Sequence, residues 1–292
     1  SEEELFLLNL TTDVFRPTQC SAVAVFGEYS EDKNTIIGRN MEWDKGSELQ
    51  VAKLAAVTTY INSDRNNICT VGVLGYMGSL TGFNDKGLFM ANLDSETGVE
   101  QVEDFDGISS YVFDEREALE RESDIETGYK IFLNKEYSYN FIIAMADKKE
   151  SKDFECNISG EGTHIRRELR AWDSQLNEGV TWGIPCGVGA VNSFVLKGNT
   201  DNHKSEDNSA RWETMKRELK NRGEKITFDE LKEVIGYCKD GIPGSGGVGD
   251  LYSDAVCHSV MFCPNTMKLE ISFASKKING IKTKYEPVDV QF

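Results

Sequence analysis

The sequence is short of basic residues, and this shortage argues against one large class of function. Its 292 residues contain 32 Lys and Arg against 49 Asp and Glu, which gives a net charge of −17 and a pI near 4.7. Binding to a phosphate backbone depends on clustered basic side chains. We therefore expect no nucleic-acid partner.

Long apolar runs are also lacking. Every run stops well short of the roughly 20 residues that cross a bilayer, so we expect no membrane insertion. Residues 1–10 begin with three Glu after the first Ser and lack the basic end and apolar core of a signal peptide. No signal peptide is visible in this segment, and the compartment stays open, as does homo-oligomerisation.

Paired metal-binding motifs are missing as well. The seven cysteines are scattered without a CxxC pair, a spacing that matches neither a zinc site nor a dense disulfide framework. His164, His203 and His258 each stand alone in the sequence. We expect no metal and no cofactor. A Cys–His hydrolase remains an alternative, because such partners meet only in the fold, but structural roles for the three histidines are favoured.

A glycine motif, GSGGVG at residues 244–249, has the spacing of a dinucleotide-binding turn. It follows a predicted helix and the turn GIPGS, whereas a dinucleotide-binding turn follows a strand. We interpret it as a loop near the mouth of a pocket.

Several short segments rich in apolar and β-branched residues, bounded by turn residues, predict strands. They lie at residues 21–28, 35–43, 51–60, 69–74, 139–146, 259–263 and 268–274, with a tight turn and a further strand within residues 82–94. Helical spacing covers residues 115–136, with a break near residues 123–124.

Two further helices are predicted near the C-terminus. Asn208 is the predicted cap of the first, which ends at Gly223, and Thr227 with Glu230 forms the capping box of the second. There is no linker or internal repeat. The order of strand pairs, helices and strand pairs predicts a single α+β domain built of largely antiparallel layers.

The segment from Cys20 to Asp44 carries a candidate reactive centre. A cysteine stands directly before one strand, and the returning strand brings GRNMEW at residues 38–43. An arginine near the sulfur favours the thiolate, as Arg39 would. The carboxylate of Glu42 can hold or orient an α-amine. A free α-amino group titrates near 7.7–8.0, so it can act as a base without histidine. A buried structural cysteine beside a charged pair is the plainer alternative.

Four segments, in this order, resemble the choloylglycine hydrolases, penicillin V acylases and related penicillin acyltransferase-type proteins, with acid ceramidase more distant. They are CSAV with GRNMEW at residues 20–23 and 38–43, LTGFNDKGLFMANLD at residues 80–94, AVNSF at residues 190–194, and NSARWETM at residues 208–215. The resemblance implies the four-layer αββα fold of N-terminal-nucleophile hydrolases. It covers most of the chain.

The resemblance also implies the site residues. Cys20 matches the nucleophile and Arg39 the arginine beside it, while Glu42 stands where the relatives usually have aspartate, so that Asp44 is an alternative carboxylate. Two oxyanion donors are implied. One is the side chain of an asparagine, and the other is a backbone N–H at the end of the strand after the tight turn. The asparagine is Asn192, and the backbone donor belongs to Asn92 or Asp94. A second arginine, Arg211, completes the set.

The implied activity is cleavage of a linear amide of an N-acyl conjugate, such as a bile-salt, N-acyl-amino-acid or penicillin-like amide, through a Cys20 thioester. Residues 1–19 are then a propeptide removed by self-cleavage, and residues 20–292 are the hydrolase domain. The pocket walls are expected to include Phe83, Phe89, Met90 and Phe194, with core packing as the alternative role. An amide-forming acyltransferase and an unprocessed protein that only binds acyl ligands are the alternative functions.

Overall fold

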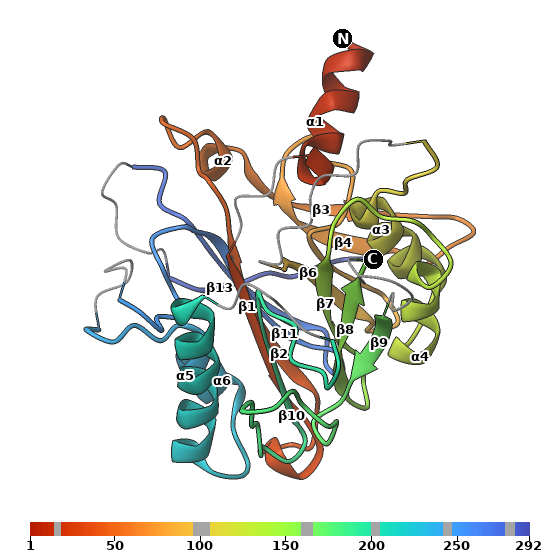
Figure 1. Ribbon diagram of the computed structural model, residues 1–292. Coiled ribbons are helices and arrows are strands. Elements are labelled where there is room, and N and C mark those ends of the chain that lie inside the picture. The colour runs from red at the N-terminus through yellow and green to blue at the C-terminus, as the bar shows by residue number, and fades with distance from the viewer. Residues whose placement is uncertain (15–18, 96–105, 159–165, 200–204, 242–246, 278–283) are drawn as a thin grey trace.

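Two antiparallel sheets form the centre of the molecule (Figure 1). The structure is a computed structural model, and it describes residues 1–14, 19–95, 106–158, 166–199, 205–241, 247–277 and 284–292. Neighbouring strands within each sheet pair antiparallel throughout. The predicted α+β class with largely antiparallel sheets is therefore confirmed.

The first sheet has the strand order β10-β1-β2-β11-β12-β13. Its strands are β1 (Cys20–Val25), β2 (Ile36–Glu42), β10 (Gly187–Val191), β11 (Val256–Cys263), β12 (Lys268–Phe273) and β13 (Glu286–Pro287). Every residue of β1 and β2 is buried, because these two central strands are covered on both faces. Most of β1 is small and apolar, whereas β2 carries buried Arg39, Asn40 and Glu42.

The second sheet has the strand order β3-β4-β5-β6-β7-β8-β9. Its strands are β3 (Ala55–Tyr60), β4 (Ile68–Val73), β5 (Thr81–Asn84), β6 (Phe89–Asp94), β7 (Phe141–Ala146), β8 (Ser151–Asn157) and β9 (Arg166–Arg170). The tight turn predicted before β6 is present, and Gly87 at φ +95° takes its left-handed position.

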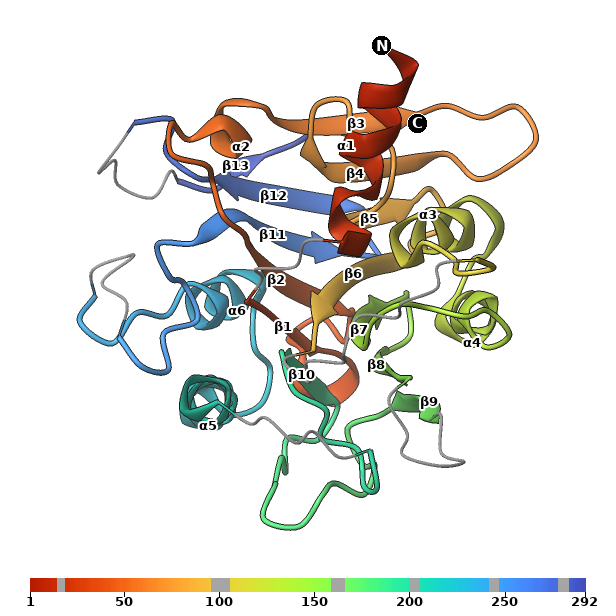
Figure 2. The same ribbon diagram turned by 45° about the horizontal axis from the view of Figure 1, so that its top comes forward.

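Helices cover both outer faces, and Figures 1 and 2 both show one pair on each side. Helices α5 (Glu206–Arg222) and α6 (Phe228–Ile235) lie on the first sheet, while α3 (Tyr111–Arg121), α4 (Ile125–Gly128) and the 3-10 helix η2 (Tyr129–Phe132) lie on the second. The remaining short elements are η1 (Gly27–Tyr29) and α2 (Gln50–Lys53).

The two sheets and the two sets of helices form four layers, and three apolar clusters lie between them. One lies between the sheets and contains Cys20, one lies under α3 and η2, and one lies under α5 and α6. The predicted αββα sandwich is thus confirmed. None of the helices in the described ranges is long and apolar enough to span a membrane.

Helix α1 (Glu2–Val14) projects from the body (Figure 1) and turns apolar side chains to solvent. Its apolar side chains face solvent, as in Phe6 and Leu7, which are 64% and 67% exposed. The three buried residues of α1 are polar, namely Asn9, Thr12 and Asp13. Asn9 donates to Gly75 O at 3.2 Å and accepts from the Met77 N–H at 2.5 Å. Hydrogen bonds, more than apolar contact, hold α1 on the body.

Local sequence signals located several elements and missed others. The capping box of Thr227 and Glu230 is present in full, and Gly223 ends α5 at φ +78° as predicted. The predicted break near residues 123–124 is confirmed, since Asp124 caps the new helix α4. Helix α1 was not predicted from the sequence.

Two predictions about element ends were wrong. The strand expected at residues 51–60 begins only at β3, because residues 50–53 form the short helix α2. Asn208 does not cap α5: Ser205 does, by accepting from the Asn208 N–H, and the Asn208 side chain is buried among tertiary partners.

Candidate active site

The first residue of β1 is the centre of the candidate site. Cys20 is 2% exposed and lies between the sheets, whereas Gln19 before it is exposed. Three atoms of Cys20 have polar partners. Its N–H donates to Asn192 Oδ1 at 2.5 Å, its Sγ lies 3.5 Å from Arg39 Nη2, and its carbonyl accepts from Arg211 Nη1 at 3.0 Å. The structure thus brings together a thiol, two guanidinium groups and an amide from four different elements or loops.

Antiparallel pairing explains how Arg39 reaches the sulfur. Residue Ala22 of β1 pairs with Arg39 of β2, and side chains of paired residues extend from the same face of a sheet. Cys20 lies two residues before Ala22 on β1, so its side chain extends from that face as well. Arg39 Nη2 also donates to Asn92 O at 2.7 Å, which connects the two sheets. Among the described residues, Nε and Nη1 of this buried arginine have no hydrogen-bond partner.

Burial and charge act in opposite directions on the sulfur. Burial raises the pKa of the Cys20 thiol above its usual value, and Arg39 is the largest opposing influence, followed by the Glu42 N–H. Burial likewise lowers the pKa of Arg39, while the neighbouring thiol and carboxyl groups favour its charged form. With Gln19 attached, the sulfur is therefore a protonated thiol at neutral pH, and its nucleophilicity depends on a base.

The carboxyl group of Glu42 lies next to Arg211. Both side chains are buried, the Arg211 Nη1–Glu42 Oε2 distance is 3.3 Å, and Ser253 Oγ donates to Glu42 Oε1. Burial raises the pKa of Glu42, whereas Arg211 and Ser253 act in the opposite direction. The alternative carboxylate, Asp44, lies on an exposed turn and accepts from the Gly46 N–H.

Asn192 joins the groups on either side of Cys20. Its Oδ1 accepts from the Cys20 N–H and from Arg211 Nη2, the latter at 3.2 Å, and its Nδ2 donates to Asp94 O at 2.7 Å. An amide nitrogen has two hydrogens, so the bond to Asp94 leaves one to donate elsewhere. The backbone N–H of Asn92 donates to Leu80 O at 3.3 Å.

A fully buried glutamate beside these groups was not predicted from the sequence. Glu115 of α3 accepts from Ser79 Oγ at 2.8 Å and from Asn92 Nδ2 at 3.3 Å. Burial raises its pKa to about 8, and these two hydrogen bonds and Arg39 oppose that rise. A single glutamate in a charged helix is typical of a solvated surface, so only the fold places it here.

Three more polar residues belong to the hydrogen-bond network of Arg211 and Glu42, and the sequence analysis did not assign them to the site. Asp207 forms an ion pair with Nε at 3.0 Å, Asn208 accepts from Nη2, and Ser253 holds the shared partner Glu42. Asp207 also accepts from the Gly249 N–H at 3.0 Å, which ties the end of the glycine motif to the site. Residues 244–246 of that motif lie outside the described residues.

Other candidates lie apart from these contacts. His258 of β11 is buried and bonded to Thr81 Oγ1 at 3.0 Å, and its pKa is lowered well below the usual value by burial and then by Arg39. His164 and His203 lie outside the described residues. All seven cysteines are free thiols. The four apolar side chains expected as pocket walls are core residues here: Phe83, Phe89 and Phe194 lie between the sheets and Met90 lies under α3.

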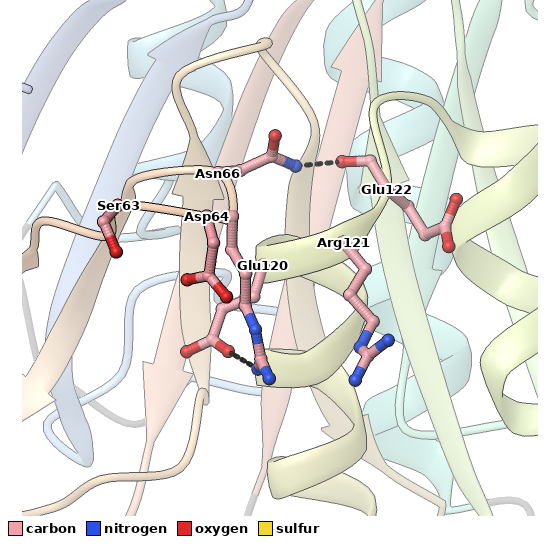
Figure 3. Close-up of a pocket in the computed structure, with 7 residues that line it drawn as sticks. Ser63, Asp64, Asn66, Glu120, Arg121 and Glu122 are labelled. Atoms are coloured by element: carbon pink, nitrogen blue, oxygen red, sulfur yellow. Dashed lines mark hydrogen bonds and ion pairs between the residues drawn. The ribbon is translucent and has the colours of Figure 1, made fainter.

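A separate hollow of about 770 Å³ lies between the β3–β4 turn and the end of α3 (Figure 3). Its lining is polar and charged, and Figure 3 shows Asp64, Glu120 and Arg121 around it. Arg65 forms an ion pair with Glu120 at 2.8 Å, so part of this charge is already compensated. The hollow contains none of the residues around Cys20.

Comparison with known proteins gives likeness in structure alone. No protein-family model matches the sequence, and no curated protein matches it as a relative. Among solved structures, an N-acylethanolamine-hydrolyzing acid amidase ortholog from Caenorhabditis elegans superposes with a TM-score of 0.53 at 14% identity, over 84% of this chain and 93% of that one.

Two bacterial enzymes are similar to the same degree. A conjugated bile acid hydrolase from Clostridium perfringens has a TM-score of 0.52 at 10% identity, over 93% of this chain and 97% of that one. A penicillin V acylase from Agrobacterium tumefaciens has a TM-score of 0.51 at 12% identity, over 87% and 83%. The chain therefore has the fold that the sequence resemblance implies, that of the N-terminal-nucleophile hydrolases.

Proposed function

We propose that this protein is a cysteine N-terminal-nucleophile hydrolase that cleaves a linear amide of an N-acyl conjugate. One observation carries the proposal: the nitrogen, sulfur and carbonyl oxygen of a single buried cysteine contact Asn192, Arg39 and Arg211 respectively. A cysteine that only fills a core does not need two buried arginines beside it. Burying each guanidinium costs several kcal/mol, which is on the order of the net stability of a folded domain.

Maturation is the first reaction proposed. The Cys20 sulfur attacks the carbonyl carbon of Gln19, the C–N bond of the Gln19–Cys20 peptide breaks, and the acyl group passes to sulfur while the nitrogen takes a proton. Water then hydrolyses the thioester, which gives a Gln19 carboxylate and a free Cys20 α-amine. Residues 1–19 are the propeptide in this scheme, and residues 20–292 are the hydrolase.

The freed amine changes the chemistry of the site. It titrates near 7.7–8.0 when unperturbed, so it can take the thiol proton at neutral pH, which a peptide nitrogen cannot do. The Cys20 nitrogen already lies 2.5 Å from Asn192 Oδ1, so this carbonyl can orient the amine. Arg39 favours the resulting thiolate through its charge.

Amide hydrolysis follows the same path with an external substrate. The thiolate attacks the amide carbonyl, a thioester forms, the amine leaves with a proton, and water releases the acid. The second hydrogen of Asn192 Nδ2 and a backbone N–H within residues 92–94 are the proposed oxyanion donors. Within this range the Asn92 N–H already donates to Leu80 O at 3.3 Å, so it would have to exchange that partner to bind an oxyanion.

The charges near Cys20 favour a neutral or anionic substrate. Nε and Nη1 of Arg39 are buried donors without a partner among the described residues, so an oxygen of the substrate would satisfy them. The similar structures are named for an N-acylethanolamine, a conjugated bile acid and penicillin V, all of which are amides. We propose bile-salt, N-acyl-amino-acid and penicillin-like amides as the classes to assay.

Intact-mass measurement of purified protein tests the proposal. Wild-type protein should lose residues 1–19 and then release amine from at least one of the three amide classes. Cys20→Ala should remain full length and inactive while keeping its fold. Cys69→Ala is the matched control, because Cys69 is an equally buried thiol in the second sheet, and it should mature normally.

Two results would contradict the proposal. One is amide release by a chain that mass spectrometry finds only at full length. The other is an active Cys20→Ala variant combined with an inactive His258→Ala variant, which would favour a Cys–His mechanism instead. Competing amines added to the assay would distinguish a hydrolase from an acyltransferase by their products.

A further inference from the structure

A cavity of about 270 Å³ lies between β10, α5 and the loop before β10. Its walls are mostly apolar, with a few polar side chains among them. The wall residues that matter here are Val180, Val191, Val195, Trp212, Ser193 and Asn208. Val191 and Ser193 are the chain neighbours of Asn192, so the cavity lies directly behind this residue of the candidate active site.

The cavity is separate from the space in front of the Cys20 sulfur. Val191 belongs to the apolar layer between the first sheet and its helices, whereas Cys20 belongs to the layer between the sheets. Alternate residues of a strand face opposite sides of a sheet, so these two layers are divided by the sheet itself. A ligand behind Asn192 therefore does not compete with an acyl group on Cys20.

The walls of the cavity are held in place without a ligand. The Asn177 N–H donates to Val195 O at 2.9 Å, and Trp212 Nε1 donates to Thr181 O at 3.0 Å, so the loop between them is fastened at both ends. The Trp212 ring also packs on Trp182 with centroids 4.6 Å apart. Preformed concave sites with apolar walls and few polar groups are typical of small-molecule binding.

The Asn208 side chain in the cavity wall has capacity for one more hydrogen-bonding group. Asn208 is 1% exposed, and its Nδ2 donates to Asn192 O and to Ser193 Oγ, both at 3.1 Å. Its Oδ1 accepts from Arg211 Nη2, and a carbonyl oxygen has two lone pairs. Glu213, the one charged side chain among the lining residues, is already paired with Lys216 at 2.5 Å, so its charge is largely compensated.

We propose that this cavity is a binding site for a small neutral molecule with an apolar body and one hydroxyl or amide group. The volume equals that of roughly nine waters, which suits a single-ring compound. The apolar body contacts the valines and Trp212, and the polar group bonds Asn208 or Ser193.

Occupancy of this site acts on the candidate active site through Asn208. A ligand that bonds Asn208 changes how this side chain holds the Asn192 backbone and Arg211, and both of these residues contact Cys20. This coupling, unlike the binding itself, rests on the proposed function. It predicts that a bound ligand changes the rate of amide cleavage without competing with substrate.

Binding is tested with 4-fluorobenzyl alcohol followed by fluorine NMR on the full protein. We expect saturable binding in the millimolar range, at least several-fold weaker binding of 4-fluorotoluene because it lacks the hydroxyl, and loss of binding in Ser209→Trp. Ser209 lines the cavity from the exposed side of α5, so this substitution fills the space without touching the contacts of Cys20. Ser209→Ala is the matched control and should bind normally.

No saturable binding, or equal binding by Ser209→Trp with native circular dichroism, would overturn the site. The coupling is read separately, as a change of about twofold or more in the rate of amide release at saturating alcohol. An unchanged rate with demonstrated binding would overturn the coupling. Failure of the proposed hydrolase activity would show instead as no amide release in the absence of the alcohol.

Discussion

Glu42 offers a sharp test of the site, because a second carboxylate two residues away serves as its control. Glu42 is 1% exposed and paired with Arg211 and Ser253, whereas Asp44 lies on an exposed turn. Removing one partner of a buried ion pair costs about 3–5 kcal/mol. We expect about 3 kcal/mol for Glu42→Ala, the low end, because Arg211 keeps Asp207 as a second carboxylate at 3.0 Å.

Asp44→Ala should change the free energy of unfolding by no more than about 0.5 kcal/mol, as surface substitutions usually do. Glu42→Asp withdraws the carboxylate by one methylene and weakens one of its two contacts, so a loss of about 1 kcal/mol is expected. Self-cleavage should slow by at least about tenfold in Glu42→Ala, which equals about 1.4 kcal/mol in the barrier, and should hardly change in Asp44→Ala.

Urea unfolding in a Cys20→Ala background gives the stabilities free of maturation, and intact-mass time courses with Cys20 present give the cleavage rates. An equal or larger effect of Asp44→Ala on both measurements would refute the assignment of Glu42 as the carboxylate of the site. A large loss of stability in Glu42→Ala with unchanged cleavage would show that its pairing with Arg211 is structural only.

Three further outcomes are expected. Asn192→Ala should lower amide turnover of matured protein by about 10²–10³, the usual effect of removing one oxyanion donor, and a change below about fivefold would remove Asn192 from that role. Glu115 has a pKa raised to about 8, so its contribution to stability is fully present below its unfolded pKa near 4.5 and is lost as the pH rises through 8. The free energy of unfolding of Cys20→Ala, measured by thermal unfolding, should therefore fall over this range by up to roughly 1.4 kcal/mol per pH unit because of this group. The added substitution Glu115→Gln should flatten this pH dependence, and an unchanged slope would contradict the assignment. Thr227→Ala should cost about 1 kcal/mol by removing the capping box of α6, with the exposed Asp229→Ala as control, and equal midpoints in urea would contradict it.

The sequence predicted those parts of the fold that depend on short-range signals. The capping box of Thr227 and Glu230, the break before Asp124 and the end of α5 at Gly223 each involve residues within one or two turns of the helix that they mark. The cap of α5 was misassigned because Asn208 has partners about 15 residues away, Asn192 and Ser193, which no local pattern reveals.

The candidate site divides in the same way. The resemblance named residues whose side chains the structure brings into contact around Cys20, as with Arg39, Asn192 and Arg211. Glu115 and Ser253 were missed because each is an ordinary residue in its own segment. Their significance comes from contact with partners of another layer or loop, and those contacts exist only in the fold.

The way helix α1 is attached has a thermodynamic consequence. Most helices bury an apolar face, so detaching one exposes apolar surface, raises the heat capacity and is promoted strongly by denaturant. Detaching α1 would expose the polar groups that it bonds, such as the carbonyl of Gly75, the N–H of Met77 and the hydroxyls of Tyr76 and Ser110, which water solvates readily. Its release should therefore show a small heat-capacity change and a shallow dependence on urea. After cleavage at Gln19–Cys20, the binding of this segment to the rest of the protein would depend on exchange of its hydrogen bonds with water and on its concentration. The segment would then behave as a reversible ligand of the protein from which it was cut.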